Sequence, residues 1–376
     1  MASTQRAVIV GGGVLGTMHA VAARRRGFEV VHLEREAEAR GASVRNFGLV
    51  WVSGRKAGRE LSLALRAREL WAELGARVPG LGFRAAGSLT LAIGDAELAL
   101  LKEAAALPDA ERRGFELLDP TAVREVNPAL RGEFAGGLLC RADAIVEPRQ
   151  VLPALRGCLA ARQGTSGYTW LPGREVTEVA PNAVRDHTGA WHHGDLVVLA
   201  TGAALAGIAG AELSAAPIRR CRLQMMQTEP LGEELTTSVA DGDSFRYYPA
   251  YRDAGLDRLG PQQPIAAEHR MQLLMVQRAD GGLTIGDTHA YEEPFDFAVE
   301  EAPYEHLRSV AEALLGRELP KVRRRWAGVY CETTDGSIYH RSTVREGVIA
   351  VTAPGGRGMT CSAGIAGETF DALESA

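Results

Sequence analysis

The chain has 376 residues, a formal net charge of −5, and 46% hydrophobic and 24% charged residues, which is the composition of an ordinary globular protein. This balance excludes a disordered or repetitive chain, and the mild acidity without a dense basic face argues against a nucleic-acid partner. The length exceeds what one hydrophobic core usually supports, so we expect a large α/β domain and a smaller second domain.

Two further features bear on the compartment. No segment is long and apolar enough to span a bilayer, and residues 7–23 contain glycines and a histidine where a signal peptide would be uniformly apolar. The five cysteines are scattered and include no C-x-x-C pair, which fits a reduced cytosol and neither a disulfide framework nor a zinc site. We therefore expect a cytoplasmic protein without a membrane partner or a metal site.

The first predicted element is a short buried strand over residues 7–10, followed by a glycine turn and a helix over residues 14–26. The turn has the spacing G-x-G-x-x-G, with Gly11, Gly13 and Gly16 at the glycine positions. The first glycine permits the tight turn, the second lets the backbone approach a pyrophosphate, and the third lets the helix pack closely on the strand. The start of the helix would present its free N–H groups to phosphates.

A second predicted strand, over residues 29–33, leads to Glu34. Its carboxylate is placed where dinucleotide sites bind the ribose hydroxyls, and it would repel the 2′-phosphate of NADP. A glycine turn of some other α/β protein is the alternative, because G-x-G-x-x-G alone is a weak signal. The order of strand, turn, helix, second strand and Glu34 favours the dinucleotide site.

The middle of the chain alternates helices and strands. We predict helices over residues 57–75, 96–106 and 150–162, a short helix capped by Asp119, and strands over 87–93 and 136–140. Short strands follow over 168–191, and an apolar strand over 195–199 ends in the turn Ala200-Thr201-Gly202. That strand can return to the first sheet beside the dinucleotide.

In the last third of the chain the predicted secondary structure changes from alternating helices and strands to strands joined by turns. Residues 217–294 have the character of an antiparallel sheet, with strands predicted at 222–228, 271–278 and 283–285, and a helix is predicted over 304–315. From Trp326 onward the sequence is again rich in glycine, as at the beginning of the chain. It ends in the turn Gly355-Gly-Arg-Gly-Met-Thr360 and a helix predicted from residue 362. The first domain is therefore predicted to combine the beginning, middle and end of the chain.

Four separated motifs resemble one family in their order along the chain. They are the first glycine turn with Glu34, the strand ending in Ala200-Thr201-Gly202, Trp326-Ala-Gly328 followed by Thr334-Asp335-Gly336, and the turn from Gly355 to Thr360. Over essentially its full length the chain resembles the D-amino acid oxidase, glycine oxidase and sarcosine oxidase (DAO) family of FAD enzymes. The resemblance implies that the first turn binds the pyrophosphate, Glu34 the adenosine ribose, and the last turn the flavin pyrimidine.

The resemblance also implies a set of FAD-binding residues and a fold. The FAD contacts are expected at Gly11, Gly13, Val14, Leu15, Gly16, Glu34, Arg35, Ser43, Arg45, Asn46, Gly48, Val176, Ala200, Thr201, Gly202, Asp335, Gly355, Gly356, Arg357, Gly358, Met359 and Thr360. The expected fold is α/β (α+β overall), with a Rossmann-like FAD-binding domain and an interleaved antiparallel-sheet substrate domain. We place the first at residues 1–85, 145–216 and 325–376 and the second at 86–144 and 217–324.

A narrower likeness exists in Ser43-Val-Arg-Asn-Phe-Gly48 and the helical residues 61–71 that follow. They look like a bacterial subgroup of this family associated with phosphonate catabolism. That likeness implies aminoalkylphosphonates, N-methylated ones included, among the candidate substrates.

The chain departs from its relatives at three places. The arginine that grips the substrate carboxylate in glycine and D-amino acid oxidases is replaced by Tyr330, which disfavours a simple α-amino acid bound in their way. The cysteine that holds the flavin covalently in sarcosine oxidase aligns with Gly328, and Cys331 is out of register, so we predict non-covalent FAD and a packed Cys331. The lysine that helps sarcosine oxidase to activate oxygen falls at about Thr284, which leaves O2 and another electron acceptor both open.

The predicted substrate residues lie in the second domain. His289 is a candidate catalytic base or phosphonate donor, with a structural role as the alternative, and Thr288, Tyr248 and Tyr330 are candidate substrate contacts. Arg246 suits a phosphonate or carboxylate, with an ion pair to Asp241 or Asp243 as the alternative. Two polar runs are predicted to have no site role: His192-His193, with no carboxylate set nearby, is expected on the solvated surface, and Arg323-Arg324-Arg325 on an exposed or ion-pairing face.

The function expected from these observations is oxidation of the C–N bond of a small anionic amine by an FAD-dependent amine oxidoreductase. The imine product would hydrolyse to a carbonyl compound and an amine, and O2 as acceptor would give H2O2, which makes the enzyme an oxidase rather than a dehydrogenase. One alternative is an enzyme of the sarcosine, glycine or D-amino acid oxidase type. The other is a flavoprotein subunit that binds FAD without a catalytic role.

Overall fold

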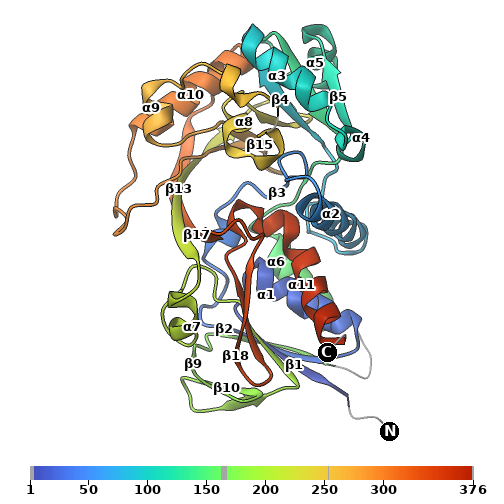
Figure 1. Ribbon diagram of the computed structural model, residues 1–376, viewed down its shortest axis with the longest axis vertical. Coiled ribbons are helices and arrows are strands. Elements are labelled where there is room, and N and C mark those ends of the chain that lie inside the picture. Colours follow the sequence, from blue (N-terminus) through green and yellow to red (C-terminus); the bar gives the residue numbers. More distant parts are fainter. Residues whose placement is uncertain (1–3, 162–166, 253, 375–376) are drawn as a thin grey trace.

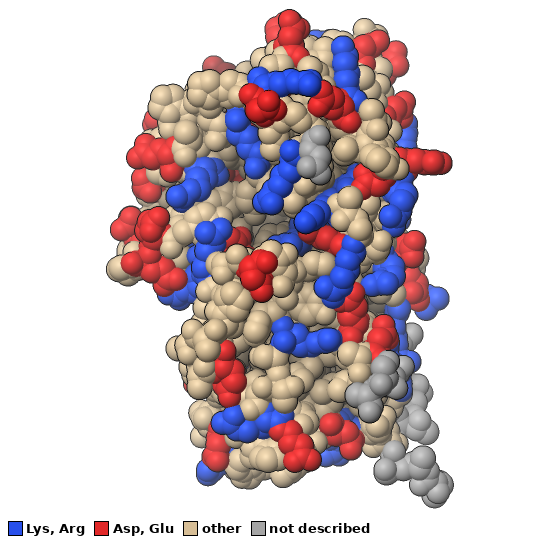
Figure 2. Space-filling model, viewed as in Figure 1, with Lys and Arg blue, Asp and Glu red and all other residues tan. Residues whose placement is uncertain are grey.

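The computed structural model describes residues 4–161, 167–252 and 254–374, which form two parts stacked along the long axis (Figure 1). The lower part in Figure 1 contains both ends of the described chain and a six-stranded sheet, and the upper part contains an eight-stranded sheet. On the face drawn in Figure 2 the acidic and basic side chains are interspersed. No helix among the described residues is both long and apolar enough to cross a membrane.

The six-stranded sheet has the strand order β18-β19-β12-β1-β2-β8 and is parallel apart from the β18–β19 pair. Its strands are β1 (Arg6–Val10), β2 (Glu29–Glu34), β8 (Tyr168–Pro172), β12 (Leu196–Leu199), β18 (His340–Arg345) and β19 (Val348–Thr352). In β1 the side chains of Ala7 and Ile9 join the core on one face, and those of Val8 and Val10 join the core on the other. Both faces of the sheet are covered, which explains the continuous apolar run in the sequence.

Helices cover one face of this sheet, as Figure 1 shows for α1, α6 and α11. The helices whose side chains form this core are α1 (Val14–Arg25), α2 (Arg59–Arg77), α6 (Val151–Ala161) and α11 (Gly358–Glu374). The opposite face packs against α7 (Gly210–Ser214) and a three-stranded sheet of β9 (Val176–Ala180), β10 (Ala183–Asp186) and β11 (Trp191–His193). This arrangement leaves the carboxyl ends of β1, β2 and β12 at one edge of the sheet, where the predicted cofactor motifs begin.

The eight-stranded sheet has the strand order β17-β13-β16-β15-β14-β4-β6-β5 and is antiparallel apart from the β14–β4 pair. Its strands are β4 (Ser88–Ala92), β5 (Phe115–Leu118), β6 (Gly136–Cys140), β13 (Ile218–Pro230), β14 (Ser238–Ala240), β15 (Leu274–Gln277), β16 (Gly282–Gly286) and β17 (Val322–Thr333). The helices of this part are α3 (Asp95–Ala105), α4 (Ala110–Arg113), α5 (Pro120–Val126), α8 (Ser244–Tyr247), α9 (Pro264–Glu268) and α10 (Ala302–Leu315). The long pair β13–β17 runs from this part down into the lower one (Figure 1).

Short elements complete the fold. The strands β3 (Leu49–Val50) and β7 (Ala144–Ile145) pair with each other, and 3-10 turns occur at η1 (Ala42–Val44), η2 (Pro249–Tyr251), η3 (Leu256–Arg258) and η4 (Gly355–Arg357). The turns η1 and η4 belong to the predicted cofactor motifs.

The mixed α/β fold with a parallel and an antiparallel sheet confirms the predicted fold class. Several predicted boundaries differ from the structure. The last helix begins at Gly358 rather than at residue 362, so residues 358–360 form its first turn instead of a loop. The predicted strand over 271–278 is shorter, at Leu274–Gln277, and the helix predicted over 150–162 ends at Ala161, with residue 162 outside the described residues. Strand β17 begins at Val322 and crosses the domain boundary predicted at residue 325, and the boundaries themselves stay a prediction.

Candidate cofactor and substrate site

The glycine turn after β1 approaches its surroundings too closely for a larger residue. Gly11 has φ +109°, and a Cβ there would lie 2.3 Å from the Ala200 carbonyl oxygen. A Cβ at Gly16 would lie 1.9 Å from the carbonyl oxygen of Gly11 itself. A Cβ at Gly13 would lie 3.1 Å from Oγ of Ser43. The turn therefore requires glycine at the first and third motif positions, and its backbone lies open to a close ligand.

Polar groups gather at the start of α1. The backbone N–H of Val14 donates to Ser43 Oγ at 2.9 Å, and the N–H of Gly12 donates to the Glu34 carboxylate at 2.7 Å. The other carboxylate oxygen of Glu34 accepts from the Glu36 N–H at 3.0 Å. The side chain of Arg35 is exposed, whereas Val14 and Leu15 are buried. The helix start, a hydroxyl and a carboxylate thus meet in the arrangement that suits a pyrophosphate and a ribose.

The strand β12 ends beside the same turn. Ala200 donates its N–H to the Val10 carbonyl at 2.8 Å, and Thr352 Oγ1 donates to the Gly202 carbonyl at 2.9 Å. Thr201 Oγ1 donates to the Ala204 carbonyl at 3.1 Å. Val176, at the start of β9, is buried against the outer face of the six-stranded sheet. The predicted residues of the middle motif therefore lie next to the first glycine turn.

The loop over residues 42–48 uses most of its polar groups internally. Asn46 donates Nδ2 to the carbonyls of Ala42 and Ser43 and accepts through Oδ1 from the N–H of Gly48 at 2.6 Å. Arg45 reaches strand β17, where its Nη1 donates to the Ala327 carbonyl at 2.9 Å. Asn46 therefore shapes the loop with its own amide, and Arg45 ties the loop to the long strand.

Two predicted cofactor residues lie at the ends of the last motifs. Asp335 is exposed and accepts the Ser337 N–H at 2.9 Å, and this contact lowers the pKa of its carboxyl. Thr360, in the first turn of α11, accepts from the Trp51 N–H at 2.8 Å and donates to the Leu49 carbonyl at 3.3 Å. The start of α11 is thereby fixed against the segment that follows the loop over residues 42–48.

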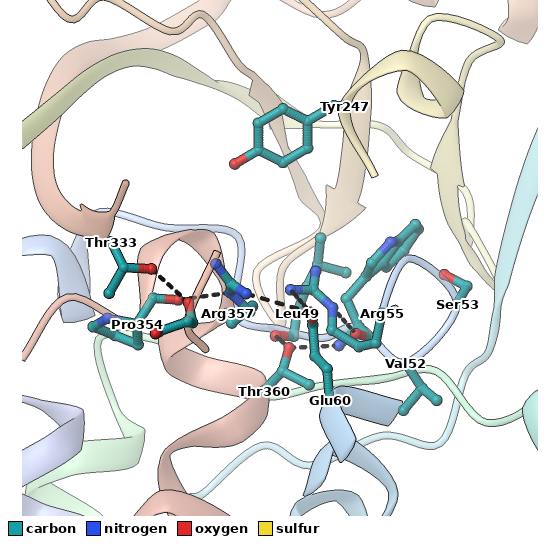
Figure 3. Close-up of polar contacts among 12 residues, drawn as sticks. Leu49, Val52, Ser53, Arg55, Glu60, Tyr247, Thr333, Pro354, Arg357 and Thr360 are labelled. Atoms are coloured by element: carbon teal, nitrogen blue, oxygen red, sulfur yellow. Dashed lines mark hydrogen bonds and ion pairs between the residues drawn. The ribbon is translucent and has the colours of Figure 1, made fainter. Parts of the chain in front are cut away.

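The turn η4 carries a buried ion cluster that sequence reasoning missed. Glu60 lies 3.6 Å from Nη1 of Arg55 and 3.5 Å from Nη1 of Arg357, and the side chains of Arg55 and Glu60 are only 5% and 7% exposed. Figure 3 shows the two guanidinium groups side by side near Glu60, below the Tyr247 ring. Arg55 also donates Nε to the Trp51 carbonyl at 2.9 Å, and its guanidinium carbon lies 5.4 Å from the centre of the Tyr248 ring. The cluster has one more positive charge than negative charge.

Two tyrosines and a histidine form a cluster that faces this turn. The hydroxyls of Tyr247 and Tyr330 lie 3.1 Å apart, and the ring of His289 stacks on that of Tyr247 with centroids 4.3 Å apart. Nδ1 of His289 contacts the Arg270 carbonyl at 2.8 Å, while its buried Nε2 has no hydrogen-bond partner among the described residues. Nε2 lies 3.8 Å from the Asp287 carboxylate, and burial raises the pKa of that carboxyl.

The other predicted substrate residues have different surroundings. Thr288 is buried and accepts the Gln224 N–H at 3.0 Å, so its hydroxyl ties the segment after β16 to β13. Tyr248 is buried and lies edgewise beside Tyr247. Arg246 is exposed and donates Nε to Asp243 at 3.1 Å, so the ion pair that was the alternative to a substrate role is present.

His192 corrects one expectation. Its Nε2 lies 3.0 Å from the buried Asp186 carboxylate, so this residue is half-buried beside a carboxylate rather than on the solvated surface. The same carboxylate also accepts from Thr188 and Ala190. Within residues 4–161, 167–252 and 254–374, no group of His, Cys, Asp and Glu side chains has the geometry of a metal site.

Known proteins resemble this chain in both fold and family. Glycine oxidase from Bacillus cereus ATCC 14579 superposes with a TM-score of 0.79 at 18% identity, covering 99% of this chain and 95% of that one. L-proline dehydrogenase from P. horikoshii superposes with a TM-score of 0.78 at 19% identity, covering 100% of this chain and 94% of that one. One of the subunits of opine oxidase from Rhizobium meliloti is 26% identical over 190 residues, which are 46% of this chain and 48% of that protein. The chain thus aligns with about half the length of that curated relative.

The family assignment rests on almost the whole chain. Residues 6–372 match the family described as DAO, FAD dependent oxidoreductase. The close glycine turn at Gly11 and Gly16, the polar groups at the start of α1 and the Glu34 carboxylate fit the cofactor of that family. The chain therefore belongs to the DAO family of FAD-dependent oxidoreductases, and its cofactor is FAD.

Proposed function

We propose that this chain oxidises the carbon–nitrogen bond of a small amine that carries an anionic group, and that an N-methylated aminoalkylphosphonate is such a substrate. The observation that carries the proposal is the position of Tyr247, whose hydroxyl lies 3.1 Å from where a Cβ at Gly356 would be. The Tyr330 hydroxyl and the His289 ring contact the same tyrosine. Two phenols and an imidazole therefore lie beside the last glycine turn of an FAD enzyme.

The residues of this cluster suit amine oxidation. When bound, FAD supplies the acceptor for a hydride. The amine must first lose its ammonium proton, because only a neutral nitrogen has the lone pair that stabilises the forming iminium. His289 can take this proton at Nε2, since Nδ1 donates to the Arg270 carbonyl and Nε2 then carries the free lone pair. Water hydrolyses the resulting imine to a carbonyl compound and an amine.

Nearby donors support an anionic group on the substrate. Burial raises the pKa of Tyr247 and of Tyr330 well above the usual value, so both phenols stay protonated and can donate hydrogen bonds. The excess positive charge of Arg55 and Arg357 over Glu60 lies on the side of η4. Phosphonate and carboxylate oxygens both accept from such groups. Tyr330 in place of the arginine of amino acid oxidases supports the phosphonate.

We propose further that O2 accepts the electrons and gives H2O2, with another electron acceptor as the alternative. We also propose that FAD is bound without a covalent bond, by the FAD-binding residues predicted above, in a domain formed by residues 1–85, 145–216 and 325–376. Cys331 is buried, and burial raises the pKa of its thiol to about 12, which supports a packed rather than a flavin-linked role. Acid precipitation of the purified protein would then leave all yellow flavin in the supernatant, and flavin in the pellet would contradict this.

Two other functions have their own support. The superposition on glycine oxidase is compatible with an enzyme of the sarcosine, glycine or D-amino acid oxidase type. The aligned relative from Rhizobium meliloti is one subunit of an oxidase, which is compatible with a flavoprotein subunit that has no catalytic role of its own.

One experiment separates these functions. FAD-loaded protein is mixed anaerobically with glycine, sarcosine, 2-aminoethylphosphonate or N-methyl-2-aminoethylphosphonate, and bleaching of the flavin absorbance is followed. Reduction by an aminophosphonate and not by the two amino acids is the expected result. Reduction by the amino acids alone would support the amino acid oxidase type, and reduction by no amine in a wider screen would support the non-catalytic subunit. H2O2 release in air then tests O2 as the acceptor.

A further inference from the structure

A cavity lies between the two parts of the molecule, away from the tyrosine cluster. It has a volume of about 160 Å³. The lower part contributes Asn46 and Arg149, and the upper part contributes Arg278, Thr284, Arg324 and Trp326. Trp326 and Tyr330 are four residues apart on β17, a separation of roughly 13 Å along a strand. The cavity and the candidate substrate cluster are therefore separate places on the same strand.

Three arginines line this cavity, and two of them have no carboxylate partner. Among the described residues, neither Arg149 nor Arg324 has an ion-pair partner, and the buried Nε of Arg324 has no hydrogen-bond partner. Arg149 lies at the exposed mouth, with its guanidinium carbon 5.2 Å from the centre of the Trp326 ring. This is unlike the two neighbours of Arg324 in the sequence, because Arg323 pairs with Asp280 and Arg325 pairs with Glu301.

Arg278 forms the inner wall and is poorly compensated. Its side chain is 7% exposed, and its Nη1 lies 3.7 Å from the Glu147 carboxylate. Its Nε and Nη2 are buried and have no hydrogen-bond partner in the described chain. Burial lowers the pKa of Arg278 to about 10, and repulsion from Arg84 and Arg149 adds to this effect. The carboxylates near this guanidinium thus compensate its charge only in part.

The two carboxylates at the cavity already serve other arginines. Glu147 is shared between Arg278 and Arg84, and its Oε1 accepts the Ala279 N–H at 3.0 Å. Asp280 pairs with Arg323 and accepts the Gly282 N–H at 3.1 Å. When Arg84 and Arg323 are counted with the three arginines of the cavity, five guanidinium groups share two carboxylates. The excess is three positive charges. Several converging guanidinium groups with free donors are the usual way in which proteins bind phosphate and carboxylate groups.

We infer that this cavity binds a small oxyanion, of the phosphate, phosphonate or carboxylate type, between Arg149, Arg278 and Arg324. The inference does not depend on which amine the enzyme oxidises, although Asn46, a predicted FAD contact, also lines the cavity. Because its residues come from both parts of the molecule, a bound anion links the two parts and stabilises the folded protein.

The test uses FAD-loaded protein in a phosphate-free buffer at constant ionic strength, titrated calorimetrically with inorganic phosphate. Acetate and 2-aminoethylphosphonate are titrated in parallel, which tells free phosphate from a carboxylate or a substrate-like phosphonate. We expect saturable binding of at least one of the three, and at ten times its Kd a rise in the thermal midpoint of about 2 °C. Arg324→Gln and Arg149→Gln should each weaken binding at least about tenfold, since each removes a charged hydrogen bond.

The neighbouring Arg325→Gln is the matched control, because it removes the same charge from the same strand on its other face. Tyr330→Phe is the second control, because it alters the candidate substrate cluster and not the cavity. Both controls should bind inorganic phosphate and acetate, which are not amines, as the unaltered protein does. The inference is overturned if no oxyanion binds, if Arg324→Gln and Arg325→Gln behave alike, or if Tyr330→Phe abolishes the binding of phosphate and acetate. Flavin content and circular dichroism of each variant establish that it is folded.

Discussion

Replacing Glu60 by glutamine should destabilise the protein far more than an ordinary loss of a salt bridge. Among the described residues Glu60 is the only ion-pair partner of both Arg55 and Arg357, at 3.6 and 3.5 Å. At an effective dielectric constant near 20 each pair attracts with about 5 kcal/mol before desolvation is counted. In Glu60→Gln the buried Arg55 and the half-buried Arg357 repel each other without a counter-charge. Removal of one member of a buried ion pair costs about 3–5 kcal/mol of unfolding free energy.

The assay is thermal unfolding of the FAD-loaded protein. For a chain of this length the expected loss lowers the unfolding midpoint by about 4–6 °C. The matched control is Glu73→Gln on the same helix α2, because Glu73 also contacts two arginines, Arg25 at 3.0 Å and Arg77 at 2.8 Å, but is 36% exposed. Each exposed pair contributes at most about 1 kcal/mol, so the loss of both pairs should shift the midpoint by no more than about 2–3 °C. Equal shifts for the two variants would refute the reasoning.

Three other predictions follow from the structure. Gly16→Ala should abolish FAD retention, because its Cβ would lie 1.9 Å from the Gly11 carbonyl oxygen, whereas Gly41→Ala, with no atom within 4 Å, should keep the flavin absorbance of the purified protein; equal flavin content would contradict this. His289→Asn should slow anaerobic flavin reduction by an active amine about 100-fold, and an unchanged rate would exclude the proposed base. Burial lowers the pKa of His19 and of His32 to about 4, below the unfolded value of about 6.5, so the unfolded chain binds more protons between these values and stability falls as the pH decreases. Each histidine should cost about 2 kcal/mol between about pH 7 and pH 5, measured by urea unfolding, and a flat profile would contradict this.

The cofactor end of the molecule was predictable because its constraints are local. The glycine motif that joins the first strand to the first helix spans only the six positions from Gly11 to Gly16. The structure shows why Gly11 and Gly16 exclude a side chain. Glu34 was predictable because it ends the next strand, β2, which pairs with β1 and places the carboxylate beside the glycine turn. There it accepts the Gly12 N–H.

The candidate substrate end was less predictable because its contacts join distant residues. Tyr247 and Tyr330 meet across 83 positions, and Glu60 meets Arg357 across nearly 300 positions. Neither pair leaves a periodic or spaced pattern in the sequence. Between Tyr247 and Tyr248 the sequence has no signal either, because only the start of α8 decides which phenol faces Gly356.

The run Arg323-Arg324-Arg325 shows how one strand can separate two roles that the sequence presents as one. Successive side chains of β17 point to opposite faces, so Arg324 shares a face with Trp326, Gly328 and Tyr330, and Arg323 and Arg325 lie on the other. On the shared face Trp326 donates to the Arg45 carbonyl in the lower part of the molecule, and Tyr330 contacts Tyr247 of α8 in the upper part. A shift of one residue in the pairing of β17 with β13 would exchange the two faces. It would withdraw the tyrosine from the candidate substrate site and the unpaired arginine from the cavity together, so the register of this strand pair fixes both sites.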